Sequence, residues 1–186
     1  MTLVLASGSP RRRQLLEWAG IALVVQPSDV DEHWVKDEDP AAAAERLARS
    51  KAIGPAGRVL LAADTVVHFD DKPFGKPTDP ADAAAMLAEL SGRWHHVTTG
   101  VALRSTTGVL SSLRVTTDVR IRSLPPAEIH RYVATGEPLD KAGAYGIQGL
   151  GGALVAEVRG SWTNVMGLPL EATLRALRAH GIEASG

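Results

Sequence analysis

Residues 3–12, Leu-Val-Leu-Ala-Ser-Gly-Ser-Pro-Arg-Arg, predict a short apolar strand, then a turn, then a helix. Pro10 suits the first helical position, where an N–H would lack a partner in any case. Ser9 before it is a residue type that often caps a helix. A strand that passes through a tight turn into a helix is typical of an α/β fold.

The same turn has the features of a phosphate-binding site. The amides of residues 7–9 can point at one spot, and the N-terminus of the following helix favours an anion there. Arg11 and Arg12 can each hold phosphate oxygens through paired hydrogen bonds. A strand followed by a Ser-Pro helix start also occurs without any ligand, so this motif alone leaves both interpretations open.

Size and composition set broad limits. The chain has 186 residues, and we expect one domain over residues 1–186 with a core of its own. It has no cysteine, which excludes disulfides and thiolate metal sites. The net charge is −1, so no overall field calls for nucleic acid or a membrane, and an anion site must be a local cluster. With no membrane-length apolar run and no signal peptide before the first strand, we expect a cytoplasmic protein.

Strand and helix signals alternate in the first half of the chain, and the second half is richer in β-structure. The resulting prediction is an α/β fold with a mixed, partly antiparallel sheet. Helices are expected at residues 11–19, 40–53, 80–91, 125–134 and 169–180. Further strands are expected at residues 22–26, 59–63, 66–69, 95–104, 109–121 and 153–158.

Asp64 follows the apolar run of residues 59–63. A carboxylate at the end of a central strand usually projects into the ligand crevice of an α/β sheet. There it can bind Mg²⁺ or act as a base. A cap or turn residue is the alternative. Asp29, Asp31 and Glu32, in the acidic connection after the second strand, could join Asp64 around a cation or belong to a solvated loop.

Lysine is scarce, and two lysines have informative positions. Lys51 lies in a predicted helix, and Lys76 is fixed between Gly75 and Pro77, which suits a positioned ammonium. Each could instead be a solvated surface charge.

Residues 140–149, Asp-Lys-Ala-Gly-Ala-Tyr-Gly-Ile-Gln-Gly, combine small residues with a few polar groups. Glycine permits close approach of the backbone to a ligand, and Gln148 carries both a donor and an acceptor for reading a base edge. A tight, closely packed loop is the alternative. The six histidines have no metal-ligand spacing, and His95 and His96 should face opposite sides of a strand.

Six motifs occur in order along nearly the whole chain. They are Leu-Ala-Ser-Gly-Ser-Pro-Arg-Arg at 5–12, Ala-Asp-Thr at 63–65, Gly-Lys-Pro at 75–77, Leu-Ser-Gly-Arg at 90–93, Thr-Gly-Val at 99–101 and Thr-Gly-Glu-Pro-Leu-Asp-Lys-Ala-Gly-Ala-Tyr-Gly-Ile-Gln-Gly at 135–149. With these motifs the chain resembles the Maf family of nucleoside triphosphate pyrophosphatases.

The resemblance implies cleavage of a nucleoside triphosphate between its α and β phosphates, with a divalent cation, Mg²⁺ or Mn²⁺. It also implies an elongated α/β fold similar to that of inosine triphosphate pyrophosphatases, with a central substrate cleft. Arg11, Thr65 and Gln148 match the family's dTTP/UTP branch, whereas the 7-methyl-GTP branch typically has Trp, Gln and Glu at these positions.

The resemblance further implies a role for each matching residue. Asp64 would be catalytic and would hold the metal together with Glu32. Substrate would be bound by Ser7, Arg11, Arg12, Lys51, Thr65, Lys76 and Gln148. A third arginine, Arg13, could compete with its neighbours for a phosphate.

Two other functions stay open at this point. One is a nucleotide-binding regulator of septum formation and cell division, and the other is a 7-methyl-GTP pyrophosphatase. The resemblance also leaves a homodimer open, and it does not choose between ordinary and modified pyrimidine nucleotides.

Overall fold

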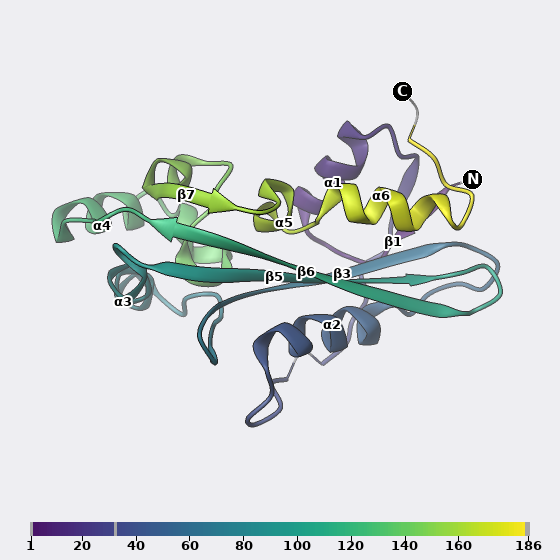
Figure 1. Ribbon diagram of the computed structural model, residues 1–186, viewed down its shortest axis with the longest axis horizontal. Coiled ribbons are helices and arrows are strands. Elements are labelled where there is room, and N and C mark those ends of the chain that lie inside the picture. The colour runs from purple at the N-terminus through teal and green to yellow at the C-terminus, as the bar shows by residue number, and fades with distance from the viewer. Residues whose placement is uncertain (1, 32, 185–186) are drawn as a thin grey trace.

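A seven-stranded mixed sheet with helices on both faces forms the centre of the protein (Figure 1). The structure is a computed structural model that describes residues 2–31 and 33–184. Its strands are β1 (Leu3–Leu5), β2 (Leu23–Val25), β3 (Leu60–Phe69), β4 (Lys72–Phe74), β5 (Trp94–Arg104), β6 (Leu110–Ile121) and β7 (Val155–Arg159). Its α-helices are α1 (Pro10–Trp18), α2 (Pro40–Lys51), α3 (Pro80–Leu90), α4 (Pro126–Val133), α5 (Trp162–Met166) and α6 (Leu170–Arg178). Three short 3₁₀ helices are η1 (Glu137–Asp140), η2 (Ala142–Ala144) and η3 (Leu150–Leu154).

The strands lie in the order β2-β1-β3-β5-β6-β7, and β4 pairs with β3 beside this path. β1 is parallel to β2 and β3, whereas the other pairs are antiparallel. The β5–β6 hairpin forms the long axis of the molecule in Figure 1. The predicted fold class, α/β with a mixed and partly antiparallel sheet, is therefore confirmed.

The core has two large apolar clusters. One lies between α3, α4 and the strands and includes Leu87 and Ile129. The other lies around β1, α1 and α6 and includes Leu16 and Leu177. A smaller cluster contains Ala48 of α2, which packs on the face of the sheet opposite α5 and α6 (Figure 1). Side chains from both large clusters border the candidate site described below.

β3 is much longer than β1, and this difference opens a gap in the sheet. β1 pairs with β3 at Leu60 and Leu61, and β4 pairs with the same edge of β3 from Val67 to Phe69. Between them, residues 62–66 pair with β5 on the other edge. Within the described part of the chain, no strand fills the first edge at these residues. Of the residues at this gap, Asp64, Thr65 and Val66 line the cavity described below.

The expectation that Asp64 ends a strand was wrong. The polar pair 64–65 interrupts the apolar run, which suggested two segments, 59–63 and 66–69. The structure has one continuous strand through Asp64, because β5 pairs with β3 without interruption from Leu60 to His68. Asp64 still faces a crevice, but the crevice exists because β1 ends early.

Helix starts follow the sequence closely, with one exception. Asp39 caps α2 through its side chain, which accepts from the amides of Ala41 and Ala42, and Pro40 is the first helical residue. Ser9 makes no such side-chain bond at the start of α1. β4 and α5 were not predicted. β4 has a proline at its centre, which argues against a strand, and α5 has only five residues and ends at Gly167.

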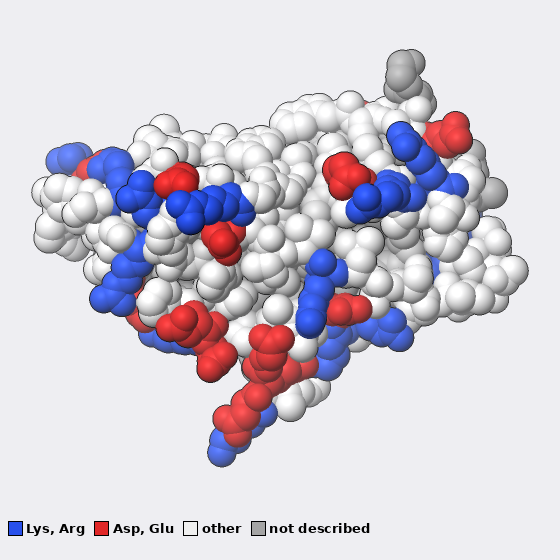
Figure 2. All heavy atoms as spheres, viewed as in Figure 1, with Lys and Arg blue, Asp and Glu red and all other residues white. Residues whose placement is uncertain are grey.

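Neither positive nor negative charge dominates the face of the molecule shown in Figure 2. Basic and acidic side chains are interspersed over the face in Figure 2, as the net charge of −1 suggests. No helix in the described residues combines the length and apolar character that a membrane crossing needs.

Candidate active site

A cavity of about 610 Å³ lies at the gap in the sheet. Its walls come from the turn after β1, the end of α2, the middle of β3, the end of β4 and the loop after η1. Every predicted site residue that the structure describes lines it: Ser7, Arg11, Arg12, Lys51, Asp64, Thr65, Lys76 and Gln148. Glu32 lies outside the described residues.

Asp64 and Lys51 form a buried ion pair in this cavity. Lys51 is the last residue of α2, and its Nζ lies 2.5 Å from Oδ1 of Asp64. Each residue is 8% exposed. α2 lies this close to the sheet because Gly100, opposite Asp64 on β5, has no side chain; a Cβ there would lie 2.3 Å from the carbonyl oxygen of Ala44. The Thr-Gly-Val motif therefore permits the packing that brings Lys51 to Asp64.

Arg12 connects three parts of the site. Its guanidinium donates to Oγ of Ser7 at 3.0 Å, to Oγ1 of Thr65 at 3.0 Å and to the carbonyl oxygen of Gly167 at 2.9 Å. Thr65 is also hydrogen-bonded to Thr99 on β5. Arg12 thus fixes the turn after β1 against β3 and the end of α5. A direct contact between Arg12 and a phosphate stays a prediction.

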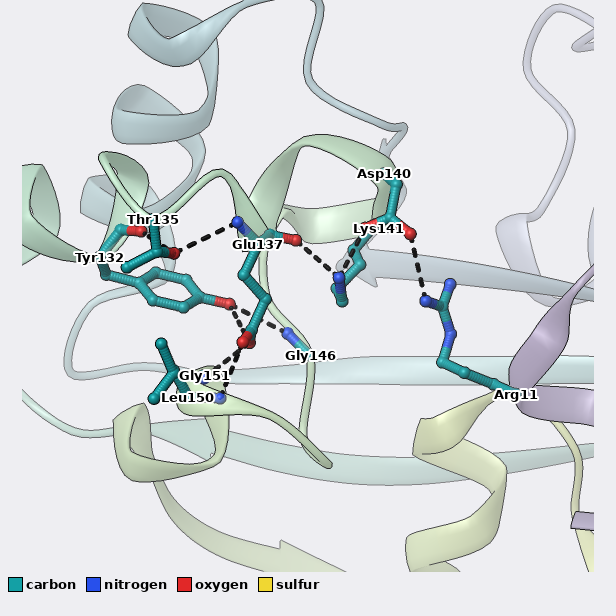
Figure 3. A network of polar contacts seen from close by, with 9 residues as sticks. All are labelled: Arg11, Tyr132, Thr135, Glu137, Asp140, Lys141, Gly146, Leu150 and Gly151. Atoms are coloured by element: carbon teal, nitrogen blue, oxygen red, sulfur yellow. Dashed lines mark hydrogen bonds and ion pairs between the residues drawn. The ribbon is translucent and has the colours of Figure 1, made fainter. Parts of the chain in front are cut away.

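Arg11 reaches across the cavity from α1 to η1. Its Nη1 lies 3.3 Å from Oδ2 of Asp140, whose Oδ1 accepts from Nζ of Lys141 at 2.5 Å (Figure 3). Arg13 instead pairs with Glu17 one turn along the same helix, in an exposed position. Arg13 therefore does not compete with Arg11 in this structure.

Lys76 is the most accessible of these cations. It follows β4, and its exposed side chain borders the cavity. None of the hydrogen bonds and ion pairs among the described residues involves its ammonium. The preceding Gly75 is held by the amide of Gly143, which donates to its carbonyl oxygen at 3.1 Å. Lys76 thus offers an uncommitted positive charge from a fixed backbone.

The acidic connection contributes less than the sequence suggested. Ser28 and Trp34 border the cavity, but Asp29 and Asp31 do not. Asp31 accepts from the amide of His33 and lies beside its ring.

The loop after η1 is organised by Glu137 and Tyr132, which the sequence analysis did not single out. The Glu137 carboxylate accepts from Tyr132 and from the amides of Leu150 and Gly151 (Figure 3). Burial opposes its charge, but these hydrogen bonds outweigh burial and lower the pKa of Glu137. Glu137 lies inside the longest motif, so its position was visible, but its partners were not.

The glycines of this loop serve packing. A Cβ at Gly149 would lie 2.5 Å from Oε2 of Glu137, and one at Gly143 would lie 2.8 Å from a methyl group of Val67. These glycines therefore allow the loop to pack tightly against other protein atoms, whereas contact between this stretch and a ligand stays a prediction. Gln148 is exposed on it and borders the cavity.

The histidines lie elsewhere. His95 is fully buried, and its Nε2 lies 2.8 Å from the hydroxyl of Tyr145. Burial lowers the pKa of His95 to about 4. His96 faces the other side of the sheet and pairs with Asp118, as the alternation of a strand predicted. No histidine in the described residues lines the cavity.

The fold and the cavity together have the features of a protein that binds phosphorylated ligands. A mixed α/β sheet opens over one buried carboxylate, and cationic side chains from α1, α2 and the segment after β4 surround it. Such a site suits an anionic, phosphorylated ligand, because its positive groups lie in a confined and partly desolvated space.

The chain belongs to the Maf family, since the family model described as "Maf-like protein" matches residues 2–180. It is 53% identical to a "dTTP/UTP pyrophosphatase" of Anaeromyxobacter dehalogenans, covering 96% of this chain and 94% of that one. It is 48% identical to a protein of the same name from Moorella thermoacetica, covering 99% and 97%. Among solved structures, a HAM1 protein from Coxiella burnetii aligns with a TM-score of 0.53 at 16% identity, covering 96% and 99%. This last likeness concerns the fold alone, and it supports the expected fold class.

Proposed function

We propose that the protein is a nucleoside triphosphate pyrophosphatase that hydrolyses dTTP and UTP to the monophosphate and pyrophosphate. The observation that carries the proposal is the buried Asp64–Lys51 pair inside a cavity bordered by Arg11 and Lys76. Relatives that match almost the whole chain and carry the name dTTP/UTP pyrophosphatase support it.

The chemistry follows from the charges in the cavity. Water attacks the α phosphorus, and the bond from this phosphorus to the oxygen that bridges the α and β phosphates breaks. Pyrophosphate then leaves with the bridging oxygen. Asp64 orients the water and accepts its proton. Arg11, Lys51 and Lys76 neutralise the triphosphate and the charge that develops on the leaving group. Arg12 holds Ser7 and Thr65 so that the site keeps this shape.

A divalent cation fits this set of donors. Mg²⁺ commonly binds through one or two carboxylates, substrate phosphates and water. Asp64 supplies one such carboxylate, and we propose Glu32 as the second. The described residues include no group of three or more His, Asp or Glu that could hold a metal by themselves. We therefore propose that Mg²⁺ or Mn²⁺ enters with the nucleotide, where it would neutralise phosphate charge.

Gln148 is proposed to select the base. Thymine and uracil present a carbonyl, an imino N–H and a second carbonyl, and a neutral amide can donate to one and accept from the next. A carboxylate at this position could not donate. The exposed position of Gln148 on the wall of the cavity is compatible with this role. A cytoplasmic location, where such nucleotides are used, stays a prediction.

A nucleotide panel scored for released pyrophosphate tests the proposal. We expect dTTP and UTP to be the best substrates, with activity lost after EDTA and restored by Mg²⁺ or Mn²⁺. Binding of dTTP without pyrophosphate release would indicate a regulator of cell division instead. Preference for 7-methyl-GTP would place the protein in the other branch, and full activity after exhaustive chelation would exclude the metal.

A further inference from the structure

Glu137 is the centre of a polar network behind the wall that carries Gln148. It opens η1, and its two carboxylate oxygens face the turn of residues 146–151 (Figure 3). Oε1 accepts from the hydroxyl of Tyr132 and from the amide of Gly151, both at 2.9 Å. Oε2 accepts from the amide of Leu150 at 2.8 Å. The carboxylate thus holds the end of the turn through its backbone.

The turn is shaped to receive this network. A Cβ at Gly149 would lie 2.5 Å from the Glu137 carboxylate, and a Cβ at Gly151 would lie 2.4 Å from the Tyr132 hydroxyl. The same hydroxyl accepts from the amide of Gly146 at 3.3 Å. The glycines at both ends of the turn therefore lie against Tyr132 and Glu137, and the path of the turn depends on these two side chains.

Gln148 lies between these fixed points. The turn has one internal bond, in which the amide of Gly149 donates to the carbonyl oxygen of Gly146 at 3.3 Å. None of the hydrogen bonds among the described residues involves the Gln148 side chain. The place from which its side chain leaves the backbone is therefore set by the turn, whose end Glu137 holds through the amides of Leu150 and Gly151.

From this arrangement we infer that Glu137 is a positioning residue for base selection: it fixes the turn that presents Gln148 to the nucleobase. The inference rests on the proposed function, in which Gln148 contacts the base. Glu137 itself does not border the cavity, so it touches no substrate.

The side chain and the backbone of Glu137 contact different parts of the site. Its side chain holds the turn of Gln148, whereas its backbone carbonyl oxygen accepts from Nζ of Lys141, which also contacts Asp140, the partner of Arg11. A change of the side chain alone leaves this second path intact. The inference therefore predicts altered base preference with little change in phosphate binding.

Glu137→Gln is the most informative variant, because it keeps the size of the side chain. One acceptor oxygen becomes an NH₂ group, so either the Leu150 amide or the Tyr132–Gly151 pair of donors faces another donor. We expect the ratio of kcat/KM for dTTP to that for GTP to fall by about tenfold, the size of one lost hydrogen bond to a charged group. The inhibition constant of inorganic tripolyphosphate should stay within about twofold of wild type, because the phosphate side is untouched.

Glu128→Gln is the matched control. Glu128, on α4, also has a lowered pKa, through its hydrogen bond to Arg122, but it does not border the cavity. It should leave the dTTP to GTP ratio unchanged. If Glu137→Gln does not fold, Tyr132→Phe removes one donor from the same network and should shift the ratio in the same direction by about threefold.

A double variant separates positioning from general loosening. In a Gln148→Ala background, Glu137→Gln should change the ratio no further. An unchanged ratio in the single variants, or an equal further change in the Gln148→Ala background, would overturn the inference while leaving the proposed function intact. A wild-type protein that releases no pyrophosphate from dTTP would overturn the proposed function first.

Discussion

The cavity has two walls with different designs: the first carries Asp64, Lys51, Arg11 and Lys76, and the second is the turn of residues 146–151 that carries Gln148. Each wall depends on one carboxylate, the buried Asp64 for the first and the half-buried Glu137 for the second, and these carboxylates have different partners. Asp64 faces the ammonium of Lys51 inside the cavity, so both charges can exchange partners with a ligand. Glu137 faces backbone amides behind the turn of residues 146–151, and it cannot exchange them without loosening that turn. The first arrangement suits chemistry on a charged group, and the second suits a fixed shape for recognition.

The largest effect is expected on the first wall. Asp64→Asn should keep the fold and lower kcat by roughly 10²–10⁴-fold, the range for a positioned acid–base group. The check is turnover of dTTP at saturating Mg²⁺. Asp118→Asn is a control, because Asp118 pairs with His96 away from the cavity. A rate for Asp64→Asn within about threefold of wild type would mean that the carboxylate is not catalytic.

Low pH should destabilise the fold through His95, which lies next to the second wall. His95 contacts Tyr145, which precedes the turn, and burial lowers its pKa from 6.5 to about 4. As the pH falls through 6.5, His95 takes up a proton in the unfolded chain but not in the folded protein. The free energy of unfolding should therefore be highest above pH 6.5 and should fall as the pH decreases toward 4. The loss should reach about 3 kcal/mol, at 1.36 kcal/mol for each unit of pKa.

Chemical unfolding of wild type and His95→Gln from pH 7 to pH 4 measures this loss, with the interval set by the pKa of 6.5 and about 4. The variant should be less stable at neutral pH but should lose less on acidification. His130→Gln, at an exposed position on α4, should follow the wild-type curve. Parallel curves for wild type and His95→Gln would show that His95 does not titrate in this way.

Loss of a cation from the first wall should affect every nucleotide alike. Arg11→Ala and Lys76→Ala should each reduce transition-state stabilisation by about 1.5–3 kcal/mol, as expected for hydrogen bonds to charged groups. The measurement is kcat/KM for dTTP, UTP and GTP. Arg13→Ala, which removes an exposed pair with Glu17, should have little effect. A Lys76→Ala variant that alters base preference but not the rate with dTTP would contradict its assignment to phosphate.

The smallest effect on catalysis, and the most selective for one base, is expected from a change in Gln148 on the second wall. Gln148→Glu removes the amide donor, so one carbonyl of thymine or uracil loses its partner, at a cost of about 1–3 kcal/mol. Guanine carries donors on its imino and amino groups, which a carboxylate accepts well. The gap between dTTP and guanine nucleotides should therefore narrow, as measured with dTTP, UTP, GTP and 7-methyl-GTP.

The two walls also differ in how well the sequence predicts them. Ser7, Arg11, Lys51, Asp64 and Lys76 each lie in a short motif or at the end of an element, and the structure places all of them on the cavity. Their signal is local, because a turn, a helix end or a strand is encoded by neighbouring residues. The early end of β1, which opens the gap at Asp64, depends on sheet pairing and was not predicted.

The network of Glu137 could not be predicted in the same way. Its carboxylate holds amides that lie 13 and 14 residues away, and backbone amides have no signature in the sequence. Arg11 and Asp140 are 129 residues apart. The glycines of the loop were compatible with either a ligand or a close protein contact, and only the positions of the neighbouring atoms distinguish the two.

The central claim is that the first wall carries out catalysis and the second selects the base. It is tested most directly by kcat/KM for dTTP and GTP, measured through pyrophosphate release in Asp64→Asn and Gln148→Glu. We predict that Asp64→Asn lowers both values by the same large factor and leaves their ratio unchanged. Gln148→Glu should lower the value for dTTP alone and so reduce the ratio. The account is contradicted if Asp64→Asn retains turnover, or if Gln148→Glu lowers both values equally.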